Sequence, residues 1–513
     1  MLSVVLSAGI AGIDGFLVQV ECDTKERMPG FEIVGLPDLA VREAKERVRT
    51  ASANSGFRFP ALAFTVNLAP ADRKKEGSGF DVAILAGILQ TVGAIRREVD
   101  LSRVCLIGEL SLSGSIRPVR GALCMCVAAK EAGLKEIFVP AENAAEAAAV
   151  HGMTVYPLTD MRSLVNHLNG TEKITPMRAD EHAFEDAVLR HTLDFADVRG
   201  QAQAKRAMEI AAAGGHNILL IGPPGTGKSM LAKRLPTILP PLSFEEAVET
   251  TKIHSVAGIL PPGTPLLSAR PFRSPHHTMS AVSLVGGGAN PSPGEVSLAH
   301  NGVLFLDELP EFGRSVLEVL RQPLEEKKIT VSRAKYSVEY PANFTLVAAM
   351  NPCPCGYYNH PARECVCSPG SVHRYMSRIS GPLMDRIDMH VEVTPVCAAE
   401  LSAAAPGESS AAIRARVVRA REVQAVRFRC AQGVHTNAMM NAAMLREYCR
   451  PDAASAALLE RAMERLNLSA RAYDRILKVA RTIADLAGRD TVAAADVAEA
   501  INYRSLDRGN WGR

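Results

Sequence analysis

Eight consecutive residues, GPPGTGKS at 222–229, restrict the fold of this 513-residue chain more than any other stretch of its sequence. They match the pattern G-x-x-x-x-G-K-[ST] between an apolar run at 218–221 and a helical segment, which is the context that a phosphate-binding loop requires. Glycines let backbone N–H groups surround phosphates, and the next helix N-terminus adds partial positive charge. The predicted nucleotide contacts are Gly222, Pro223, Pro224, Gly225, Thr226, Gly227, Lys228 and Ser229.

Two residues of this loop have separate expected roles. Lys228 should reach the β- and γ-phosphates, and Ser229 should ligate Mg²⁺. A second magnesium ligand is expected from Asp307, which follows the apolar run at 303–306, because such sites use an acid at the end of a buried strand. We therefore predict ATP and Mg²⁺ as ligands.

Two other polar residues are candidates for the hydrolytic step. Glu308 can orient or deprotonate the attacking water, and the alternative is a solvated acid that opens the next helix. Asn351 follows a further apolar run at 344–350 and can position the same water. Because three strands would then deliver polar groups at their carboxyl ends, as open α/β sheets do, we predict ATP hydrolysis on an α/β fold.

Two polar stretches, at 169–192 and 397–410, divide the chain into three predicted domains. Residues 1–170 alternate strand-like and helical patterns and predict an α/β domain, while 193–396 carry the nucleotide motifs on a second one. Residues 411–507 are rich in Ala and Arg and predict a helical domain. In the first domain the predicted strands are 31–36, 64–69, 104–110 and 136–140, and the predicted helices are 37–55, 81–93 and 121–133.

Charge is distributed unevenly along the chain. The formal net charge is only +3, but the part from residue 411 to the C-terminus has 18 Arg and Lys against 11 Asp and Glu. This asymmetry hints at a nucleic acid or another acidic partner. Aromatic residues make up only 5%, which argues against an aromatic-rich stacking surface for sugars or bases.

Four of the 11 cysteines, Cys353, Cys355, Cys365 and Cys367, lie within 15 residues. Two close pairs of thiolates can surround a tetrahedral Zn²⁺, so we predict a structural zinc site in which His360 or His373 could replace one thiol. Reduced surface cysteines or a redox-labile pair are the alternatives. The odd cysteine count, the lack of a basic signal-peptide start and the absence of an 18-residue apolar run predict a cytoplasmic protein without a membrane partner.

Longer segments carry a resemblance to a known family. GPPGTGKS, the stretches at 270–312 and 380–393, and AAMNPCPCGYY at 348–358 together resemble the magnesium-chelatase-like AAA+ ATPases of the YifB/ComM type. The resemblance covers almost the whole chain. It implies a homo-hexameric ring ATPase with a C-terminal helical lid, and for the ComM type a helicase that promotes DNA branch migration during natural transformation.

The resemblance also implies roles for single residues. Asp307 and Glu308 correspond to Walker B and Asn351 to sensor 1. Arg386 sits where related ring helicases place an arginine finger, with Arg378 a less favoured candidate. Arg471 corresponds to sensor 2, and its alternative is one more basic residue on a solvated helix face. The clade's helix-2 insertion is expected within 250–300.

A basic hairpin is expected between the Walker B and sensor 1 positions. The residues at 327–347 read as two strands, with Arg333 and Lys335 at the tip. In related ring helicases a hairpin here grips the DNA backbone, so both side chains are predicted DNA contacts. An exposed hairpin with solvated charges is the alternative.

Residues 20–140 resemble a Lon-protease-type (S5-type) fold, but an active site of that type needs a nucleophilic Ser and a Lys. The resemblance places Gly79 at the nucleophile and Leu123 near the Lys position. Ser78 with Lys74 or Lys75 is the remaining possible dyad. We expect a catalytically inactive scaffold that forms the ring or binds DNA.

The leading hypothesis is thus an ATP-driven motor on branched or single-stranded DNA. The rivals are a magnesium-chelatase subunit for metal insertion into a porphyrin, a Lon-like protease, and a protein-remodelling ATPase.

Overall fold

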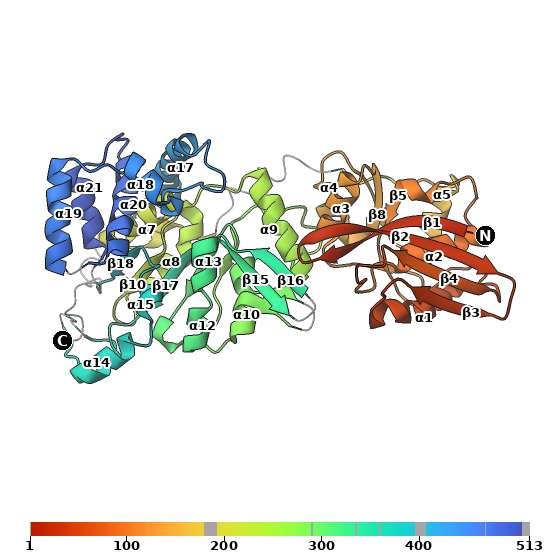
Figure 1. The fold of residues 1–513 in the computed structure, drawn as a ribbon, viewed down its shortest axis with the longest axis horizontal. Helices are drawn as coiled ribbons and strands as arrows, with labels where there is room; N and C mark the ends of the chain where they lie inside the picture. The colour runs from red at the N-terminus through yellow and green to blue at the C-terminus, as the bar shows by residue number, and fades with distance from the viewer. Residues whose placement is uncertain are drawn as a thin grey trace. The chain divides into compact units, whose positions relative to one another are not determined.

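The structure, a computed structural model, describes residues 2–178, 192–288, 291–333, 336–358, 360, 362–395, 407–466 and 468–504. It divides into two compact units (Figure 1). Unit 1 consists of Met1–Asp186 with Ser243–Ser268, and unit 2 of Ala187–Leu242 with Ala269–Arg513. Among the described residues, no helix has both the length and the apolar character needed to cross a membrane.

Unit 1 is built on a mixed seven-stranded sheet with the order β3-β4-β2-β1-β5-β8-β9. Its strands are β1 (Leu2–Ala11), β2 (Asp14–Lys25), β3 (Gly30–Val34), β4 (Ala63–Ala69), β5 (Val104–Leu106), β8 (Glu136–Pro140) and β9 (Thr154–Leu158). Its main helices are α1 (Leu39–Asn54), α2 (Asp81–Thr91), α3 (Ala122–Glu131), α4 (Ala144–Ala148) and α5 (Met161–Leu168). The strands and helices predicted in this part of the sequence are therefore confirmed.

The β1–β2 hairpin was not predicted. Its ten-residue register runs from Leu2↔Asp23 to Ala11↔Asp14, and Gly12 in the turn has φ +67°. Residues of β2 alternate between buried and more exposed, with Val18 and Val20 in the core. This period of two is a strand signal that the sequence itself contains.

Helix α9 (Phe244–Ala257) belongs to unit 1, although it comes from the middle of the ATPase segment. It begins with a capping box in which Ser243 and Glu246 satisfy each other's backbone N–H, and it ends at Gly258. Gly121 N–H donates to the Ser255 carbonyl at 3.1 Å, so α9 is hydrogen-bonded to the start of α3.

This placement corrects one predicted boundary. The predicted second domain, 193–396, included residues 243–268, whereas the structure groups them with unit 1. The reason is that α9 buries Ala247, Ile253 and several polar residues in unit 1, and packing partners distant in sequence are not visible in a local pattern.

Unit 2 contains a five-stranded parallel sheet with the order β11-β14-β17-β10-β18. The strands are β11 (Phe272–Arg273), β14 (Val303–Leu306), β17 (Thr345–Met350), β10 (Ile218–Ile221) and β18 (Met389–Glu392). The three central strands are buried throughout, as expected when helices cover both faces. Ile221 pairs with Met350 and Leu306 with Ala348, so β10, β14 and β17 end close together.

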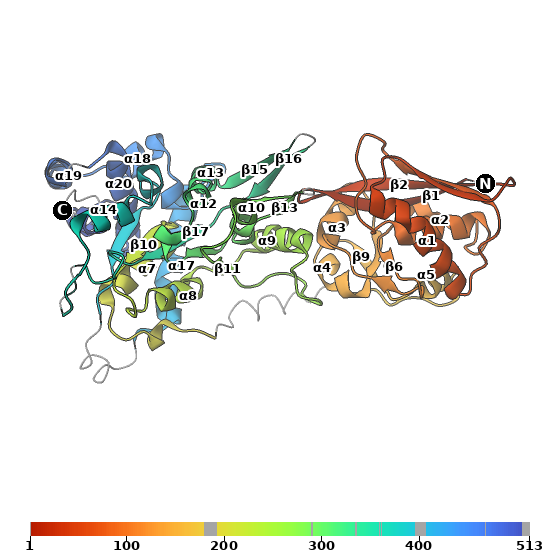
Figure 2. The same ribbon diagram turned by 90° about the horizontal axis from the view of Figure 1, so that it is seen from below.

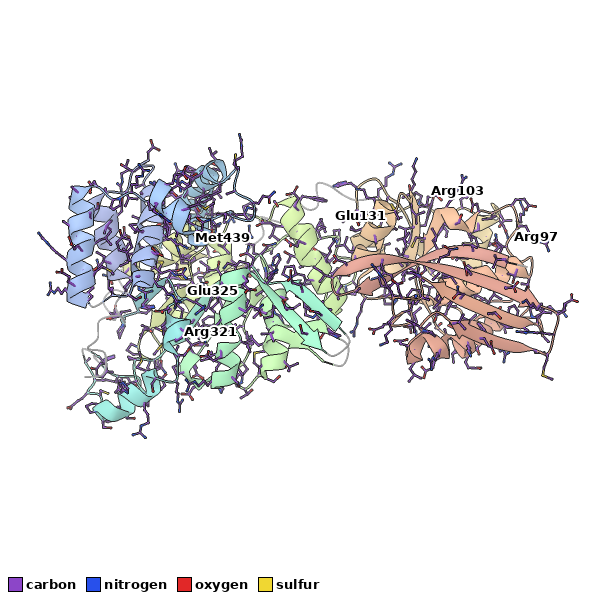
Figure 3. The ribbon with its side chains drawn as sticks, in the orientation of Figure 1. Arg97, Arg103, Glu131, Arg321, Glu325 and Met439 are labelled. Carbon is purple, nitrogen blue, oxygen red and sulfur yellow. The ribbon has the colours of Figure 1, made fainter. Side chains whose placement is uncertain are left out.

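The sheet is accompanied by α7 (Ala202–Gly214), α8 (Lys228–Ile238), α10 (Ala281–Val285), α11 (Glu295–Leu298), α12 (Arg314–Glu318), α13 (Arg321–Glu326), α14 (Pro369–Met376) and α15 (Gly381–Met384). Between α13 and β17, β15 (Lys328–Arg333) and β16 (Tyr336–Pro341) form the predicted antiparallel hairpin, which projects from its unit (Figure 2). Arg321 and Glu325 lie on α13 (Figure 3).

The C-terminal region is helical, as predicted, with α17 (Ser410–Arg427), α18 (Ala442–Tyr448), α19 (Ala453–Leu466), α20 (Ala470–Leu486) and α21 (Ala494–Asn502). It shares one hydrophobic core with the sheet, because Ile413 and Ile476 belong to the same cluster as Ile218 and Val347. The parallel sheet and this helical region confirm the predicted α/β class. The Lon-protease type of unit 1 stays a prediction.

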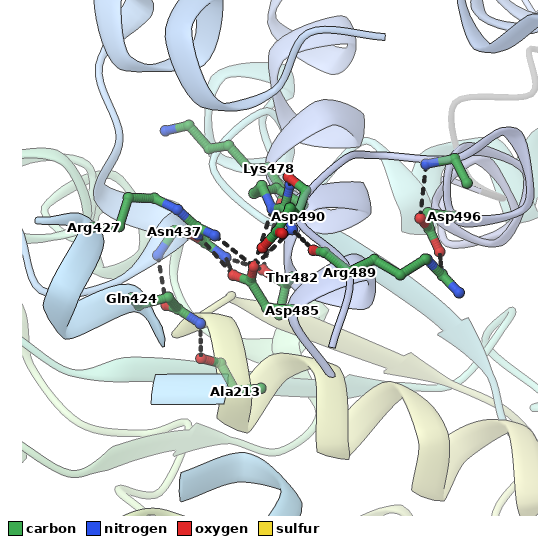
Figure 4. Close-up of polar contacts among 12 residues, drawn as sticks. Ala213, Gln424, Arg427, Asn437, Lys478, Thr482, Asp485, Arg489, Asp490 and Asp496 are labelled. Carbon is green, nitrogen blue, oxygen red and sulfur yellow. Dashed lines mark hydrogen bonds and ion pairs between the residues drawn. The ribbon is translucent and has the colours of Figure 1, made fainter. Parts of the chain in front are cut away.

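Buried Asp485 on α20 joins the lid helices (Figure 4). Its carboxylate accepts from Arg427 at 2.6 and 2.7 Å, from Arg481 at 3.0 Å and from Asn437 at 2.7 Å. Gln424 extends the network to α7 by donating to the Ala213 carbonyl at 3.0 Å. A buried charge with several charge-assisted partners fixes the relative positions of α17, α20 and the turn around Asn437.

Asp485→Ala should loosen the lid locally, because it leaves Arg427 and Arg481 buried without their partner. We expect the opening free energy of α20, measured by amide hydrogen exchange, to fall by about 3–5 kcal/mol. Asp474→Ala, at an exposed acid of the same helix, is the matched control and should change it by less than about 0.5 kcal/mol. Equal exchange in the two variants would contradict the assigned role.

Candidate functional site

The phosphate-binding loop is formed as the sequence predicted. Buried β10 leads into Gly222, and α8 begins at Lys228 after two glycines in left-handed backbone conformations, Gly225 at φ +81° and Gly227 at φ +86°. Gly222 has no room for a side chain, since a Cβ there would lie 2.2 Å from the Val393 carbonyl oxygen. The loop thus takes a tight path that exposes its backbone at a helix N-terminus, where anions bind.

Lys228 closes the loop from inside. Its Nζ donates to the carbonyl oxygens of Gly222 at 2.7 Å and Pro223 at 2.9 Å, and to Oδ1 of Asn351 at 3.2 Å. Burial lowers the pKa of Lys228, and the charges of Asp307 and Glu308 oppose that shift. The ammonium therefore sits among oxygen acceptors that an anionic phosphate can replace.

Ser229 and Asp307 meet at the predicted magnesium position. The Ser229 hydroxyl donates to Asp307 Oδ2 at 2.6 Å, although the two residues are 78 positions apart in the chain. Asp307 directly follows β14, and the parallel register brings this strand end beside β17. Hydroxyl and carboxylate oxygens are the ligand types that Mg²⁺ prefers, so these residues fit the ion.

Glu308 is an open acid at the same edge of the sheet. Its backbone is left-handed at φ +53°, and its side chain is 57% exposed. Its carboxylate pairs with the imidazole of His277, whose Nδ1 lies 3.4 Å from Oε2. His277 stacks on His276 with ring centroids 4.1 Å apart. An exposed carboxylate at this position can orient or deprotonate a water.

His277 is a site residue that the sequence did not identify. The segment 270–278 is polar and partly basic, but its sequence alone does not indicate a role. Its position follows from β11 pairing with β14, a contact across 30 residues. Two adjacent histidines shortly before an acidic strand end were the available signal, but spacing alone cannot place them at Glu308.

The three candidate arginines contact acidic residues rather than the phosphate-binding loop in the described structure. Arg386 is 8% exposed, forms an ion pair with Glu325 on α13 (Figure 3), and donates to the Pro382 carbonyl at 2.5 Å. Arg378 pairs with Glu311 at 2.8 Å and is half exposed. Arg471 lies 3.3 Å from Asp385 and is 67% exposed. The predicted finger and sensor 2 roles of Arg386 and Arg471 remain predictions.

Arg475, four residues after Arg471, has a different role. It forms an ion pair at 2.7 Å with Asp388, which is buried. Burial raises the pKa of Asp388, but Arg475 and His216 outweigh this and hold it well below its usual range. Asp388 precedes β18, the neighbour of β10. Lid helix α20 is thus anchored next to the strand that carries the phosphate-binding loop.

The four predicted metal-binding cysteines form one cluster. The Sγ atoms of Cys353, Cys355, Cys365 and Cys367 all lie within 4.8 Å of one another. Cys353 is 3.3 Å from Cys355 and 3.6 Å from Cys365, much longer than a disulfide bond of about 2.05 Å. Four thiolates about 2.3 Å from a tetrahedral Zn²⁺ lie about 3.8 Å apart. The cluster therefore fits zinc.

Hydrogen bonds favour the thiolate form of Cys355, whereas burial and the neighbouring thiols raise the pKa values of Cys365 and Cys367. Burial acts to raise the pKa of the Cys355 thiol, but the N–H groups of Tyr357 and Val366 and the other thiols lower it to about 6. His360 uses its Nδ1 to accept from the backbone N–H of Ala362 and Arg363 at 3.0 Å each. Four cysteines, with neither candidate histidine, make up the group.

The hairpin tip is only partly described. Lys335 lies outside the described residues, and so does the side chain of Arg333. At the base of the hairpin, Lys328 and Glu339 form an ion pair at 2.8 Å across the two strands. The predicted DNA contacts at the tip remain predictions.

In the described structure the side chains of the possible Ser-Lys dyad of unit 1 have other partners, and Lys74 forms an ion pair with Glu76 at 2.6 Å. Ser78 hydrogen-bonds to Glu109. Lys75 is buried and donates to the carbonyls of Pro70 and Arg73. Leu123, at the expected Lys position, is buried in α3. The expected inactive scaffold stays a prediction.

Comparison with known proteins matches three family models along the chain. Residues 194–401 match "Magnesium chelatase, subunit ChlI", residues 20–143 match "Subunit ChlI of Mg-chelatase", and residues 407–504 match "Magnesium chelatase, subunit ChlI C-terminal".

Relatives that match nearly the whole chain belong to the same group of magnesium-chelatase-like proteins. The chain is 44% identical over 515 residues to competence protein ComM of Haemophilus influenzae, covering 99% of this chain and 98% of the relative. It is 43% identical over 513 residues to uncharacterised protein YifB of Escherichia coli, with the same coverage. The 38 kDa magnesium-chelatase subunit of Cereibacter sphaeroides is 26% identical over 181 residues, covering 32% of this chain and 54% of that subunit.

Proposed function

Since this chain belongs to the YifB/ComM family of magnesium-chelatase-like AAA+ proteins, we propose that it is an ATP-hydrolysing motor that acts on DNA. The observation that carries the proposal is the convergence of Lys228, Ser229, Asp307 and Asn351 at the ends of three neighbouring parallel strands. Hydrogen bonds join them in two pairs, Lys228 with Asn351 at 3.2 Å and Ser229 with Asp307 at 2.6 Å.

The chemistry follows from these positions. Lys228 exchanges its carbonyl partners for the β- and γ-phosphates of ATP, and the backbone of 222–227 surrounds them. Ser229 and Asp307 hold Mg²⁺, which neutralises charge on the phosphates when bound. Glu308 orients or deprotonates the attacking water, and Asn351 keeps that water in line.

Completion of the site by a neighbouring subunit is part of the proposal. We assign the chain to a homo-hexameric ring in which Arg386 acts as the finger and Arg471 as sensor 2. Arg386 must leave Glu325 to do so, whereas Arg471 already carries an exposed guanidinium. An arginine added to the γ-phosphate stabilises the charge of the transition state.

We propose branched or single-stranded DNA as the substrate, and branch migration in recombination or natural transformation as the process, in the cytoplasm. The hairpin β15–β16 and the basic C-terminal region support this proposal. A relative that is 44% identical is named a competence protein. Contacts to the phosphate backbone would dominate affinity.

ATP hydrolysis should depend on Lys228 and Glu308 and respond to DNA. Lys228→Ala should lower turnover about 10²- to 10³-fold through loss of phosphate stabilisation, and Glu308→Gln should bind ATP without hydrolysing it. Lys233→Ala, at an exposed lysine on the same helix, is the control and should match the unchanged chain. The measurement is phosphate release with and without a four-way DNA junction, together with strand exchange. An assembled ring that hydrolyses ATP without DNA stimulation or strand exchange would exclude the DNA-motor proposal.

The double substitution Arg333→Ala with Lys335→Ala should weaken DNA binding by removing two phosphate contacts. We expect the slope of log affinity against log salt, measured by fluorescence anisotropy on single-stranded DNA, to become shallower by about 1.4. Lys328→Ala at the hairpin base, where the charge is paired with Glu339, should leave the slope unchanged. If both variants behave alike, the tip is not the DNA contact.

We also propose that the four cysteines hold a structural zinc. The purified protein should contain close to one zinc per chain by atomic emission, because four thiolates close a tetrahedral site. Cys365→Ser should lose the metal, and Cys430→Ser, at an exposed cysteine elsewhere in unit 2, should retain it. Wild-type protein without metal, even after incubation with zinc, would refute the site.

A further inference from the structure

The cysteine loop, residues 353–367, is built directly against the phosphate-binding loop. Gly356 follows the first cysteine pair and has φ +85°. A Cβ built at Gly356 would lie only 2.7 Å from Cδ of Pro224 and 3.4 Å from its Cγ. The two loops therefore touch at a point where only glycine fits. Because of this contact, the position of the cysteine loop limits the positions that Pro224 can take.

A second connection lies on the other side of the first cysteine pair. Asn351, two residues before Cys353, accepts a hydrogen bond from Lys228 at 3.2 Å. Between these two points the chain makes a turn, in which Gly356 N–H donates to the Cys353 carbonyl at 3.0 Å. Cys353 and Cys355 are thus held between two contacts with the nucleotide site.

The second cysteine pair comes from further along the chain. Cys365 and Cys367 precede α14, whose Tyr375 is buried. Burial raises the pKa of Tyr375 to about 12, and Asn351 N–H acts against this shift by hydrogen-bonding the phenol oxygen. In the described structure, thiol contacts of 3.6 Å from Cys365 to Cys353 and Cys355, together with the hydrogen bond from Val366 N–H to Cys355, join the two pairs. A bound metal replaces the thiol contacts with strong bonds that close the loop.

We infer that the metal-bound cysteine loop is a positioning element of the ATP site, which holds Pro224 through Gly356 and Asn351 beside Lys228. This inference rests on the proposed zinc site and on the proposed ATPase activity. When the metal is lost, the loop no longer holds these two points, so nucleotide binding weakens and the group that aligns the water is released. No protein ligand is exchanged, and the zinc takes no part in hydrolysis because four thiolates leave no open coordination position.

Thermodynamic linkage makes the inference testable without relying on catalysis. If zinc raises nucleotide affinity by some factor, nucleotide must raise zinc affinity by the same factor. Coupling between two sites in contact is typically about 5- to 150-fold. The full chain is loaded with zinc and titrated with a colorimetric chelator, with and without a non-hydrolysable ATP analogue. The analogue should raise the chelator concentration needed for half removal about tenfold.

Two variants separate positioning from general stability. Gly356→Ala should retain zinc but lose most of the coupling, because its Cβ pushes Pro224 away. Gly433→Ala is the matched control: Gly433 has a similar φ of +73°, but nothing lies within 4 Å of its Cβ position. Both substitutions carry the same left-handed strain, and the coupling should be lost in Gly356→Ala alone. Should Gly356→Ala fail to fold, the titration of the wild-type chain decides by itself.

The possible outcomes separate a failure of this inference from a failure of the zinc proposal or of the ATPase proposal. Zinc-loaded wild-type protein that binds the analogue but shows equal zinc affinity with and without it overturns the inference. A wild-type chain that takes up no zinc overturns it together with the zinc site. Zinc-loaded protein that binds no analogue refutes the ATPase proposal. Zinc stripping should also raise the KM for ATP more than it lowers kcat in the wild-type chain, and adding zinc back should reverse this.

Discussion

The nucleotide site depends on one buried side chain that precedes β10, Asn217. Its Oδ1 accepts from Leu346 N–H of β17 at 2.9 Å, and its Nδ2 donates to the Arg386 carbonyl at 3.2 Å. Its backbone N–H donates to Asp388 at 2.9 Å. The Asn217 amide thus fixes how β10, β17 and β18 are aligned along the strand direction. This alignment also fixes the point where each of these strands ends. Without that alignment, Lys228 after β10 and Asn351 after β17 would not meet.

The same region connects catalysis with the helical lid. Asp388 carries the ion pair with Arg475 of α20, and His216 hydrogen-bonds Thr482 of the same helix at 2.8 Å. Thr482 in turn lies beside the network around Asp485. A rotation of α20 would therefore move His216, which precedes Asn217 in the chain, and Asp388, which accepts from the Asn217 N–H. Under the proposed ring-motor function, this is a direct physical route by which lid movement and nucleotide state can influence each other.

Much of this arrangement could be predicted from sequence, because phosphate chemistry demands a fixed spacing of glycines, Lys228 and Ser229. Apolar runs ending in Asp307 or Asn351 were likewise sufficient to predict that polar groups gather at the carboxyl ends of these strands. The rest depended on contacts between distant segments. Neither the placement of His277 at Glu308 nor the choice of Arg475 over Arg471 as partner of Asp388 follows from spacing. The four cysteines were predicted as a group, but their contact with Pro224 required the fold.

The capture of α9 by unit 1 has a consequence for how this protein can be divided. The chain passes between the two units three times, at 186–187, 242–243 and 268–269. A fragment starting at residue 187 would carry α9 without the partners of its buried face, including Glu146, which accepts from Ser255 at 2.5 Å. Neither unit can be separated from the other by dividing the chain at a single position. Each unit of this chain consists of two separate stretches of sequence.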